Sequence, residues 1–281
     1  MRTLSAVEPV VSGFQTLEGP AYDREGNLFF VNWDLSSVVK LTPEGDVSEF
    51  FNTGGIPAGL AFHPDGSLYV ADEGENIHGI LRITTDGKSE ILANEFEGVP
   101  LNGANDLVFD RNGVLYFSDP WGSSDEVPIG GFYRLFPDGK LEQIASGLAF
   151  PNGVAINADE SAIYLAETYK NRILRFALNA DGSVGPMEHW ANTETPSGAD
   201  GMAFDANGDL YVAHFNAARV DIFNPSGTLV ETIAVPGSKP TNVAFGGKEN
   251  KTLMITECES QTLYKVELNV AGQPLNDGLN R

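Results

Sequence analysis

Six segments of this chain repeat one pattern, in which a short apolar stretch, a polar turn and a second apolar stretch follow one another. The segments are "GPAYDREGNLFFVNW", "AGLAFHPDGSLYVADEG", "NDLVFDRNGVLYFSDPW", "NGVAINADESAIYLAET", "DGMAFDANGDLYVAHFN" and "TNVAFGGKENKTLMITEC". Their anchor positions, spaced by 40, 47, 47, 48 and 41 residues, are Tyr22, Phe62, Phe109, Ile156, Phe204 and Phe245. A period of this length is typical of the blades of a β-propeller.

Each repeat continues into further strand-like sequence. A third alternating stretch follows every pair, such as "SSVVKLT" or "HGILRIT", and most copies add a glycine-containing turn and a fourth. We therefore predict an all-β fold, a six-bladed β-propeller of four-stranded antiparallel blades, formed by residues 1–281 as a single domain. The first residues, "LSAVEPVVSGF", are expected to supply the outer strand of the last blade and to close the ring. A parallel βα fold would need helical spacing between the strands, and a β-sandwich would not need a sixfold period.

Composition limits the classes of partner. The formal net charge is -22 and no cluster of Lys and Arg stands out, so we expect no nucleic-acid partner. The amino-terminal residues lack the apolar core of a signal peptide, and no apolar run is long enough to span a bilayer. A single cysteine, Cys258, excludes an internal disulfide. We therefore expect a cytoplasmic protein without a membrane partner, and the sequence does not indicate its oligomeric state.

Oxygen-bearing side chains recur at one position of the repeat. Four residues before each anchor the chain has, in order, Glu18, Ala58, Asn105, Asn152, Asp200 and Thr241. This position begins the first strand of each blade, the strand that lines the channel of a propeller, so two carboxylates and two amides would meet at one mouth. Such an all-oxygen set suits Ca²⁺, whereas zinc and copper favour His and Cys. Asn and Asp beside Gly are also turn formers, which is the alternative interpretation of each residue taken singly.

A second polar position follows ten to twelve residues after each anchor. Its members are Asn32, Asp72, Asp119, Glu167, His214 and Glu257. We interpret most of them as the wall of a pocket or as partners that orient the ligands, with surface solvation as the alternative. Asp119, in "FSDPWG", is the best candidate among them for contact with substrate or for proton transfer. No serine-hydrolase elbow, zinc-protease motif, P-loop or dinucleotide fingerprint is present to suggest other chemistry.

The sequences of the repeats resemble those of a known family. The strings that carry the likeness cover nearly the whole chain and include "LEGPAY", "NDLVFDRNGVLYFSDPWG", "FPNGVAINADESAIYLAET", "DGMAFDANGDLYVA" and "TNVAFGGKENKTLMIT". They resemble the calcium-dependent six-bladed propellers of the senescence-marker-protein, gluconolactonase and luciferin-regenerating-enzyme family. The resemblance implies that Glu18, Asn152 and Asp200 hold a catalytic divalent metal. It also implies that Asn105 contacts the substrate and, as in some members, the metal.

One position departs from the sugar-lactone hydrolases of that family. Animal members have an arginine two residues before the position of Asn105, where it holds sugar hydroxyls, and this chain has Gly103. Gly103 and Trp121 are therefore candidate substrate-binding positions at which specificity would differ. The substrate expected from this departure is a small lactone or ester, with a sugar lactone less favoured.

The resulting functional prediction is a metal-dependent lactonase, that is, a carboxylic ester hydrolase. Ca²⁺ is the expected cofactor, with Mg²⁺, Mn²⁺ or Zn²⁺ as possible substitutes. Asp200 is the first choice for the general base and Asp119 the second. Two alternatives stay open: an organophosphate or phosphofluoridate hydrolase using the same site, and a non-enzymatic propeller that binds a partner and holds a structural calcium.

Overall fold

The computed structural model describes residues 2–196 and 198–275, which fall into two compact units. One unit consists chiefly of Glu18–Asn152, and the other joins residues 2–17 to Gly153–Pro274. Strands form nearly all the regular structure of the described ranges. The three 3-10 helices found there are short and lie between strands: η1 (Trp33–Leu35), η2 (Thr168–Lys170) and η3 (Lys248–Asn250).

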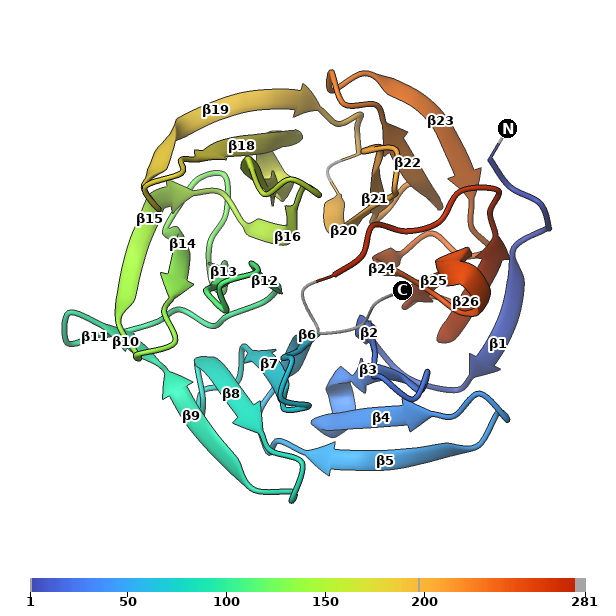
Figure 1. The fold of residues 1–281 in the computed structure, drawn as a ribbon, viewed down its shortest axis with the longest axis horizontal. Coiled ribbons are helices and arrows are strands. Elements are labelled where there is room, and N and C mark those ends of the chain that lie inside the picture. The colour runs from blue at the N-terminus through green and yellow to red at the C-terminus, as the bar shows by residue number, and fades with distance from the viewer. Residues whose placement is uncertain (1, 197, 276–281) are drawn as a thin grey trace. The chain divides into compact units, whose positions relative to one another are not determined.

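The unit of Glu18–Asn152 holds three four-stranded blades (Figure 1). The first is β2 (Leu17–Tyr22), β3 (Leu28–Asn32), β4 (Ser37–Leu41) and β5 (Val47–Asn52); the second is β6 (Pro57–Phe62), β7 (Leu68–Asp72), β8 (Gly79–Ile83) and β9 (Ser89–Ala93); the third is β12 (Leu107–Phe109), β13 (Leu115–Asp119), β14 (Gly130–Leu135) and β15 (Leu141–Leu148). Strands that follow one another in the chain are antiparallel neighbours in each sheet. This is the arrangement that alternating apolar residues and tight turns produce.

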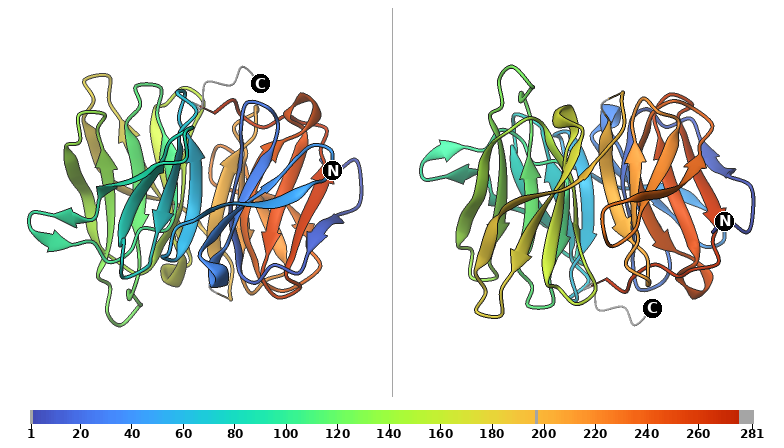
Figure 2. Two further views of the ribbon diagram at one scale, coloured as in Figure 1. Left: turned by 90° about the horizontal axis from the view of Figure 1, so that it is seen from below. Right: turned by 90° about the horizontal axis from the view of Figure 1, so that it is seen from above.

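A short hairpin interrupts the regular order of this unit. It consists of β10 (Glu95–Phe96) and β11 (Val99–Pro100), which pair with each other and stand between the second and third blades in the chain. Figure 2 shows the hairpin projecting beyond the neighbouring strands of its unit. The residues that follow it, 101–106, lead into the first strand of the third blade.

The other unit holds the remaining three blades. These are β16 (Pro151–Ile156), β17 (Ala162–Glu167), β18 (Arg172–Leu178) and β19 (Val184–Asn192); β20 (Ala199–Phe204), β21 (Leu210–His214), β22 (Arg219–Phe223) and β23 (Leu229–Ala234); and β24 (Pro240–Gly246), β25 (Thr252–Glu257) and β26 (Thr262–Glu267) with β1 (Glu8–Ser12). The outer strand β1 pairs antiparallel with β26, as Glu8 lies opposite Lys265.

The fold class predicted from the repeat is confirmed: the sheets are six four-stranded antiparallel blades, those of a six-bladed β-propeller. The expected contribution of the amino-terminal strand to the last blade is confirmed as well. That residues 1–281 make a single domain stays a prediction, and residues 1, 197 and 276–281 of that range lie outside the described residues.

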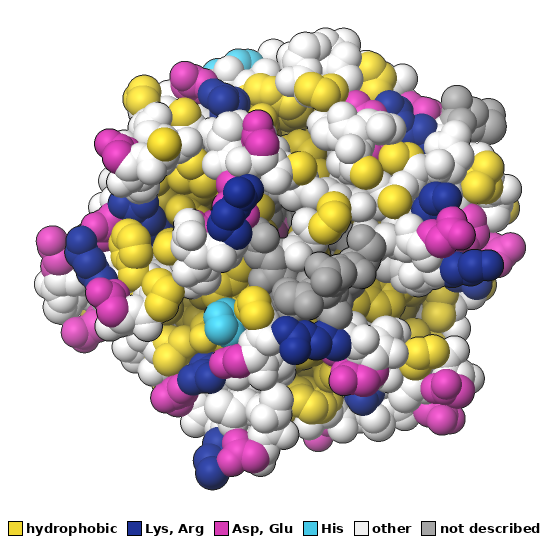
Figure 3. Space-filling view, viewed as in Figure 1, with side chains coloured by type: hydrophobic (Ala, Val, Ile, Leu, Met, Phe, Trp, Pro, Cys, Tyr) yellow, Lys and Arg dark blue, Asp and Glu magenta, His cyan; other side chains and the backbone are white. Residues whose placement is uncertain are grey.

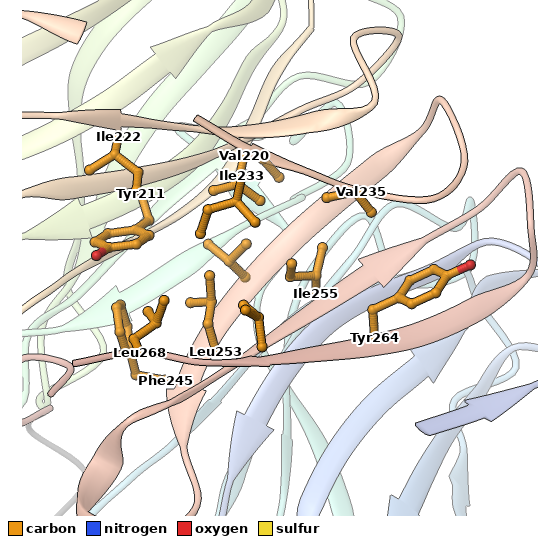
Figure 4. Packing of buried hydrophobic residues seen from close by; sticks show 13 residues of the cluster. Tyr211, Val220, Ile222, Ile233, Val235, Phe245, Leu253, Ile255, Tyr264 and Leu268 are labelled. Carbon is orange, nitrogen blue, oxygen red and sulfur yellow. The ribbon is translucent and has the colours of Figure 1, made fainter. Parts of the chain in front are cut away.

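The hydrophobic core lies between the faces of neighbouring blades. Figure 4 shows one such layer, in which Val220 and Ile222 of β22 face Leu253 and Ile255 of β25. In the other unit, β3 contributes to a similar layer with β6 and β7, and β7 and β8 to one with β12 and β13. Both faces of the inner strands are therefore buried, which explains why segments such as "LFFVN" are apolar almost throughout.

The exposed surface is charged but mixed in sign. On the face seen in Figure 3, Lys and Arg side chains of the described residues lie singly or next to acidic ones. Ion pairs also join neighbouring strands, such as Arg82 with Glu90 and Arg175 with Glu188. No helix within the described ranges is both long and apolar enough to cross a bilayer.

Glycine allows the first strands of neighbouring blades to approach closely. A Cβ atom placed on Gly19 would lie 2.1 Å from the carbonyl oxygen of Ala58, and one on Gly153 would lie 2.2 Å from that of Asp200. Real Cβ atoms do not come this close to a backbone oxygen, so only glycine fits. These glycines directly follow Glu18 and Asn152, and the close approach therefore fixes the backbone at two of the predicted ligand positions.

We predict that Gly19→Ala destabilises the protein more than Gly87→Ala. Both glycines have positive φ, at +53° and +80°, but the space around Gly87 is open. Both substitutions should cost about 1–2 kcal/mol for the backbone conformation. Gly19→Ala should lose roughly 1–3 kcal/mol more through overpacking. Thermal unfolding followed by circular dichroism measures the difference, and equal losses in Tm for the two variants would contradict the close approach.

Candidate functional site

The predicted ligand positions occupy equivalent places in their blades. Glu18 is the second residue of β2, Asn152 the second residue of β16 and Asp200 the second residue of β20. Asn105 lies two residues before β12, where its backbone N–H donates to the carbonyl oxygen of Ser118 at 3.0 Å. The register deduced from the repeat is therefore the register of the strands. The other two positions, Ala58 and Thr241, are likewise second residues, of β6 and β24.

Glu73 is the residue of this region that the sequence did not single out. It follows β7, its side chain is only 3% exposed, and its Oε1 accepts a hydrogen bond of 2.8 Å from Nδ2 of Asn105. Alignment of the six repeats had selected its neighbour Asp72, because Asp72 occupies the repeat position at the end of the second strand. The signal available in the sequence was the pair of adjacent acids in "ADEGEN".

The surroundings of Glu73 are apolar enough and negative enough to disfavour its charged form. Burial, and to a smaller extent the nearby carboxylates of Glu18, Asp72 and Asp119, raise the pKa of Glu73 to about 8, against the opposing effect of the Asn105 hydrogen bond. Three carboxylates therefore lie near Glu73, and the charge of His78 opposes the rise in pKa of two of them, Asp72 and Asp119. A bound cation is the kind of group that would balance this charge.

Asp119 holds the loop that carries Asn105. Its Oδ1 accepts a hydrogen bond of 2.7 Å from the N–H of Gly103, and its Oδ2 accepts one of 3.0 Å from the N–H of Asn102. The residue is 1% exposed, and burial raises its pKa although these hydrogen bonds oppose the shift. Its contacts are thus those of a group that fixes the backbone. A catalytic role for Asp119 stays a prediction.

Gly103 and Trp121 are in contact. A Cβ atom on Gly103, whose φ is +143°, would lie 2.9 Å from Cβ of Trp121 and 3.0 Å from Cα of Glu73. The space beside the loop is therefore filled, and a larger residue at this position would have to displace one of these neighbours. Trp121 is 37% exposed and packs edge-to-face on Trp33, with ring centroids 6.1 Å apart. An exposed aromatic surface thus lies next to the loop of Asn105.

Two other acids of the second polar position, Asp72 and Glu257, also fix backbone, whereas Glu167 forms an ion pair with Arg172. Oδ1 of Asp72 accepts from the N–H groups of Ile56 and Gly74, at 2.8 and 2.9 Å. Oε1 of Glu257 accepts from the N–H of Lys239 at 2.8 Å. Ile56 directly precedes β6, as Lys239 directly precedes β24. In each case a carboxylate at the end of a second strand holds the segment that begins the first strand of the same blade.

The predicted ligand set differs from a cluster of the usual metal-binding side chains, His, Cys, Asp and Glu. In residues 2–196 and 198–275, no three or more His, Cys, Asp or Glu side chains are grouped so that they could hold a metal ion. The predicted set differs from such a group in composition, because two of its four members, Asn105 and Asn152, are amides.

Comparison with known proteins decides the family. Residues 17–259 match the sequence model of the SMP-30/Gluconolactonase/LRE-like region, which covers most of the chain and all of the predicted site residues. The chain belongs to this family. The resemblance drawn from the strings of the repeat is therefore confirmed.

Several relatives are similar to this chain over most of their own length. A gluconolactonase of Zymomonas mobilis is 30% identical, with 89% of this chain and 78% of that protein aligned. A diisopropyl-fluorophosphatase of Loligo vulgaris is 28% identical over 89% of this chain and 88% of its own. Among solved structures, a gluconolactonase of Xanthomonas campestris is 26% identical and superimposes with a TM-score of 0.83, covering 95% of this chain and 91% of that one.

His214 is buried, and each of its two ring nitrogens has a hydrogen-bond partner. Its Nδ1 lies 2.6 Å from Oδ2 of Asp221 and its Nε2 lies 2.8 Å from the carbonyl oxygen of Pro196. Both partners accept hydrogen bonds, so the ring satisfies both only when both nitrogens carry protons. Burial lowers the pKa of His214, but the hydrogen bonds to Asp221 and Pro196 outweigh it and the net shift is upward. His214 thus ties β21 to the segment that leads into Asp200.

We predict that His214 stabilises the protein more at low pH than at high pH. A histidine with a raised folded pKa contributes stability that is fully present below its unfolded pKa of about 6.5 and is lost as the pH rises through the folded pKa. Each tenfold gain in proton affinity on folding stabilises the protein by about 1.4 kcal/mol. Urea unfolding of the wild type and His214→Gln at pH 6 and pH 9 measures this contribution. His189→Gln, at an exposed position, controls for the substitution, and an equal His214→Gln effect at both pH values would refute the charged pair.

Proposed function

We propose that this protein is a divalent-metal-dependent hydrolase that opens a lactone or a similar small cyclic ester. The observation that carries the proposal is the recurrence of Glu18, Asn152 and Asp200 as the second residue of the first strand in three blades. Hydrophobic repetition alone does not require oxygen donors at this position. Membership of a family with gluconolactonases among its similar members supports the same reaction class.

The residues present fit a hard divalent cation. Glu18, Asn105, Asn152 and Asp200 offer only oxygen donors, the preference of Ca²⁺. The raised pKa of Glu73, due to burial first and to neighbouring carboxylates after it, indicates a region that a cation would stabilise. Ca²⁺ is therefore the proposed cofactor, with Mg²⁺, Mn²⁺ and Zn²⁺ as substitutes to be compared.

We assign the following roles in the proposed reaction to individual side chains. Glu18, Asn152 and Asp200 hold the cation, and Asn105 contributes its amide oxygen to the cation or to the substrate. A bound cation would supply Lewis acidity toward the ester carbonyl oxygen. Asp200 accepts the proton of the attacking water and returns it to the alkoxide that leaves when the ring opens. We prefer Asp200 to Asp119 because both oxygens of Asp119 already accept backbone hydrogen bonds.

The aromatic surface beside Asn105 points to the substrate class. Trp121 is partly exposed, and Gly103 has no side chain that could donate hydrogen bonds to hydroxyl groups. Flat apolar surface suits a hydrocarbon or aromatic portion of a lactone better than a ring of hydroxyls. The proposed substrates are therefore lactones with an apolar substituent.

We predict that chelation abolishes hydrolysis and that re-added Ca²⁺ restores it. Because the cation binds the folded state, saturating it at about 100 times its Kd should stabilise the protein by about 2.7 kcal/mol. Glu18→Gln, which removes one ligand charge, should weaken Ca²⁺ binding by about tenfold or more. Glu25→Gln, in the exposed turn after β2, is the matched control. Full turnover after exhaustive chelation, or an unchanged calcium titration of Glu18→Gln, would contradict the proposal.

A substrate panel separates this function from its rivals. The similarity to a diisopropyl-fluorophosphatase favours a second candidate, the hydrolysis of phosphofluoridates. We expect apolar lactones to be hydrolysed with a higher kcat/KM than either aldonolactones or phosphofluoridates. Preference for phosphofluoridates would reverse the order of the two candidates, and no turnover on any ester would favour a binding scaffold.

We predict that Trp121→Ala raises KM selectively. Loss of an aromatic contact of about 1 kcal/mol should lower kcat/KM roughly fivefold for a lactone fused to an aromatic ring, and much less for an aldonolactone. Trp121→Phe keeps an aromatic ring and should recover most of the loss. Equal effects on the two lactones would show that Trp121 does not select the substrate.

A further inference from the structure

The side chain of Glu73 lies on a backbone that is held in place. Its N–H donates to the carbonyl oxygen of Ile56 at 2.8 Å, and the next residue, Gly74, donates to Oδ1 of Asp72 at 2.9 Å. The side chain is 3% exposed. A buried carboxyl group on a fixed backbone has few orientations to choose from, so its position is set by the fold.

The backbone of Asn105 is also held in place by hydrogen bonds. Its N–H donates to the carbonyl oxygen of Ser118 at 3.0 Å, and its own carbonyl oxygen accepts from the N–H of Gly59 at 2.6 Å. The backbone leaves open how the side-chain amide is turned, because its oxygen and nitrogen have nearly the same shape but opposite hydrogen-bonding character. A neighbour that accepts a hydrogen bond from one end therefore determines where the other end points.

Glu73 is that neighbour. The hydrogen bond from Nδ2 of Asn105 to Oε1 of Glu73, 2.8 Å long, turns the amide nitrogen toward the end of β7 and directs Oδ1 elsewhere. Only Oδ1 can serve as a ligand to a cation. The charged groups with the largest effect on the pKa of Glu73 are Glu18, Asp72 and Asp119, all of them acids.

The loop that carries Gly103 and Asn105 passes close to the backbone of Glu73. A Cβ atom on Gly103 would lie 3.0 Å from Cα and 3.1 Å from the carbonyl oxygen of Glu73. The loop that carries Asn105 can therefore approach Glu73 because residue 103 is glycine. Gly103, a candidate for substrate selection, thus also allows the Glu73–Asn105 contact.

We infer that Glu73 is a positioning residue, which orients the amide of Asn105 so that Oδ1 is presented to the bound cation. The inference rests on the proposed metal-dependent function, and it assigns Glu73 no direct contact with substrate or metal. Its effect should therefore pass entirely through Asn105. Partners that orient metal ligands in this way typically change metal affinity by roughly 10- to 100-fold when they are removed.

The test compares variants of the full chain by calorimetric titration with Ca²⁺, together with kcat and KM on a lactone. Glu73→Met keeps the length of the side chain but removes the acceptor, and should weaken Ca²⁺ binding by roughly 10- to 100-fold. Glu73→Gln restores an acceptor oxygen and should recover most of that loss. Glu75→Met, the same substitution at an exposed position two residues away, should bind Ca²⁺ like the wild type. Circular dichroism of the chelated proteins establishes that each variant is folded.

A double-mutant cycle decides whether Glu73 acts through Asn105. In the Asn105→Ala background, Glu73→Met should cause little further loss of Ca²⁺ affinity, because no amide is left to orient. Equal losses in both backgrounds, or a Glu73→Met variant that binds like the wild type, would overturn the inference. So would a Glu73→Gln variant that keeps its Ca²⁺ affinity but loses kcat by about two orders of magnitude, which is the signature of a general base. Absence of Ca²⁺ binding by the wild type would instead overturn the proposed function, and the inference with it.

Discussion

A buried carboxylate at the end of the second strand of a blade holds the segment from which the first strand begins. Asp72 accepts hydrogen bonds from Ile56 and Gly74, Asp119 from Asn102 and Gly103, and Glu257 from Lys239. Charge-assisted hydrogen bonds of this kind are among the stronger ones in a protein, and a buried carboxylate needs them. Asp119 in this way fixes the loop that carries the candidate ligand Asn105, whereas Asp72 and Glu257 fix the starts of the strands that carry Ala58 and Thr241.

The same contacts concentrate negative charge. Glu18, Asp72 and Asp119 lie near enough to Glu73 to raise its pKa, after the larger effect of burial. Under the proposed function, a bound cation would stabilise a region with this charge and so link the stability of the fold to the chemistry. The position of Glu73 beside Asn105 adds a second consequence, because the acid whose pKa these carboxylates raise is, by our inference, also the one that orients a candidate ligand.

The sequence predicted the blades and the register of the candidate ligands well. Glu18, Asn152 and Asp200 were aligned by counting back from apolar anchors, and each is the second residue of its strand. It predicted less about contacts. Asp119 stays a candidate for catalysis, and its carboxylate also accepts two hydrogen bonds from backbone sixteen and seventeen residues away, which no local pattern reveals.

By itself, then, the sequence determined the architecture and the identity of the repeated polar positions, because strand alternation, turns and their period are local properties of the chain. Only the tertiary structure decided which of two adjacent acids contacts Asn105. Asp72 turns to the backbone of its own blade, whereas Glu73 meets Asn105, a residue 32 positions later. Which acid meets Asn105 depends on the packing of one blade against the next, where Gly103 has no side chain to block the approach to Glu73. No single segment of the sequence encodes this packing.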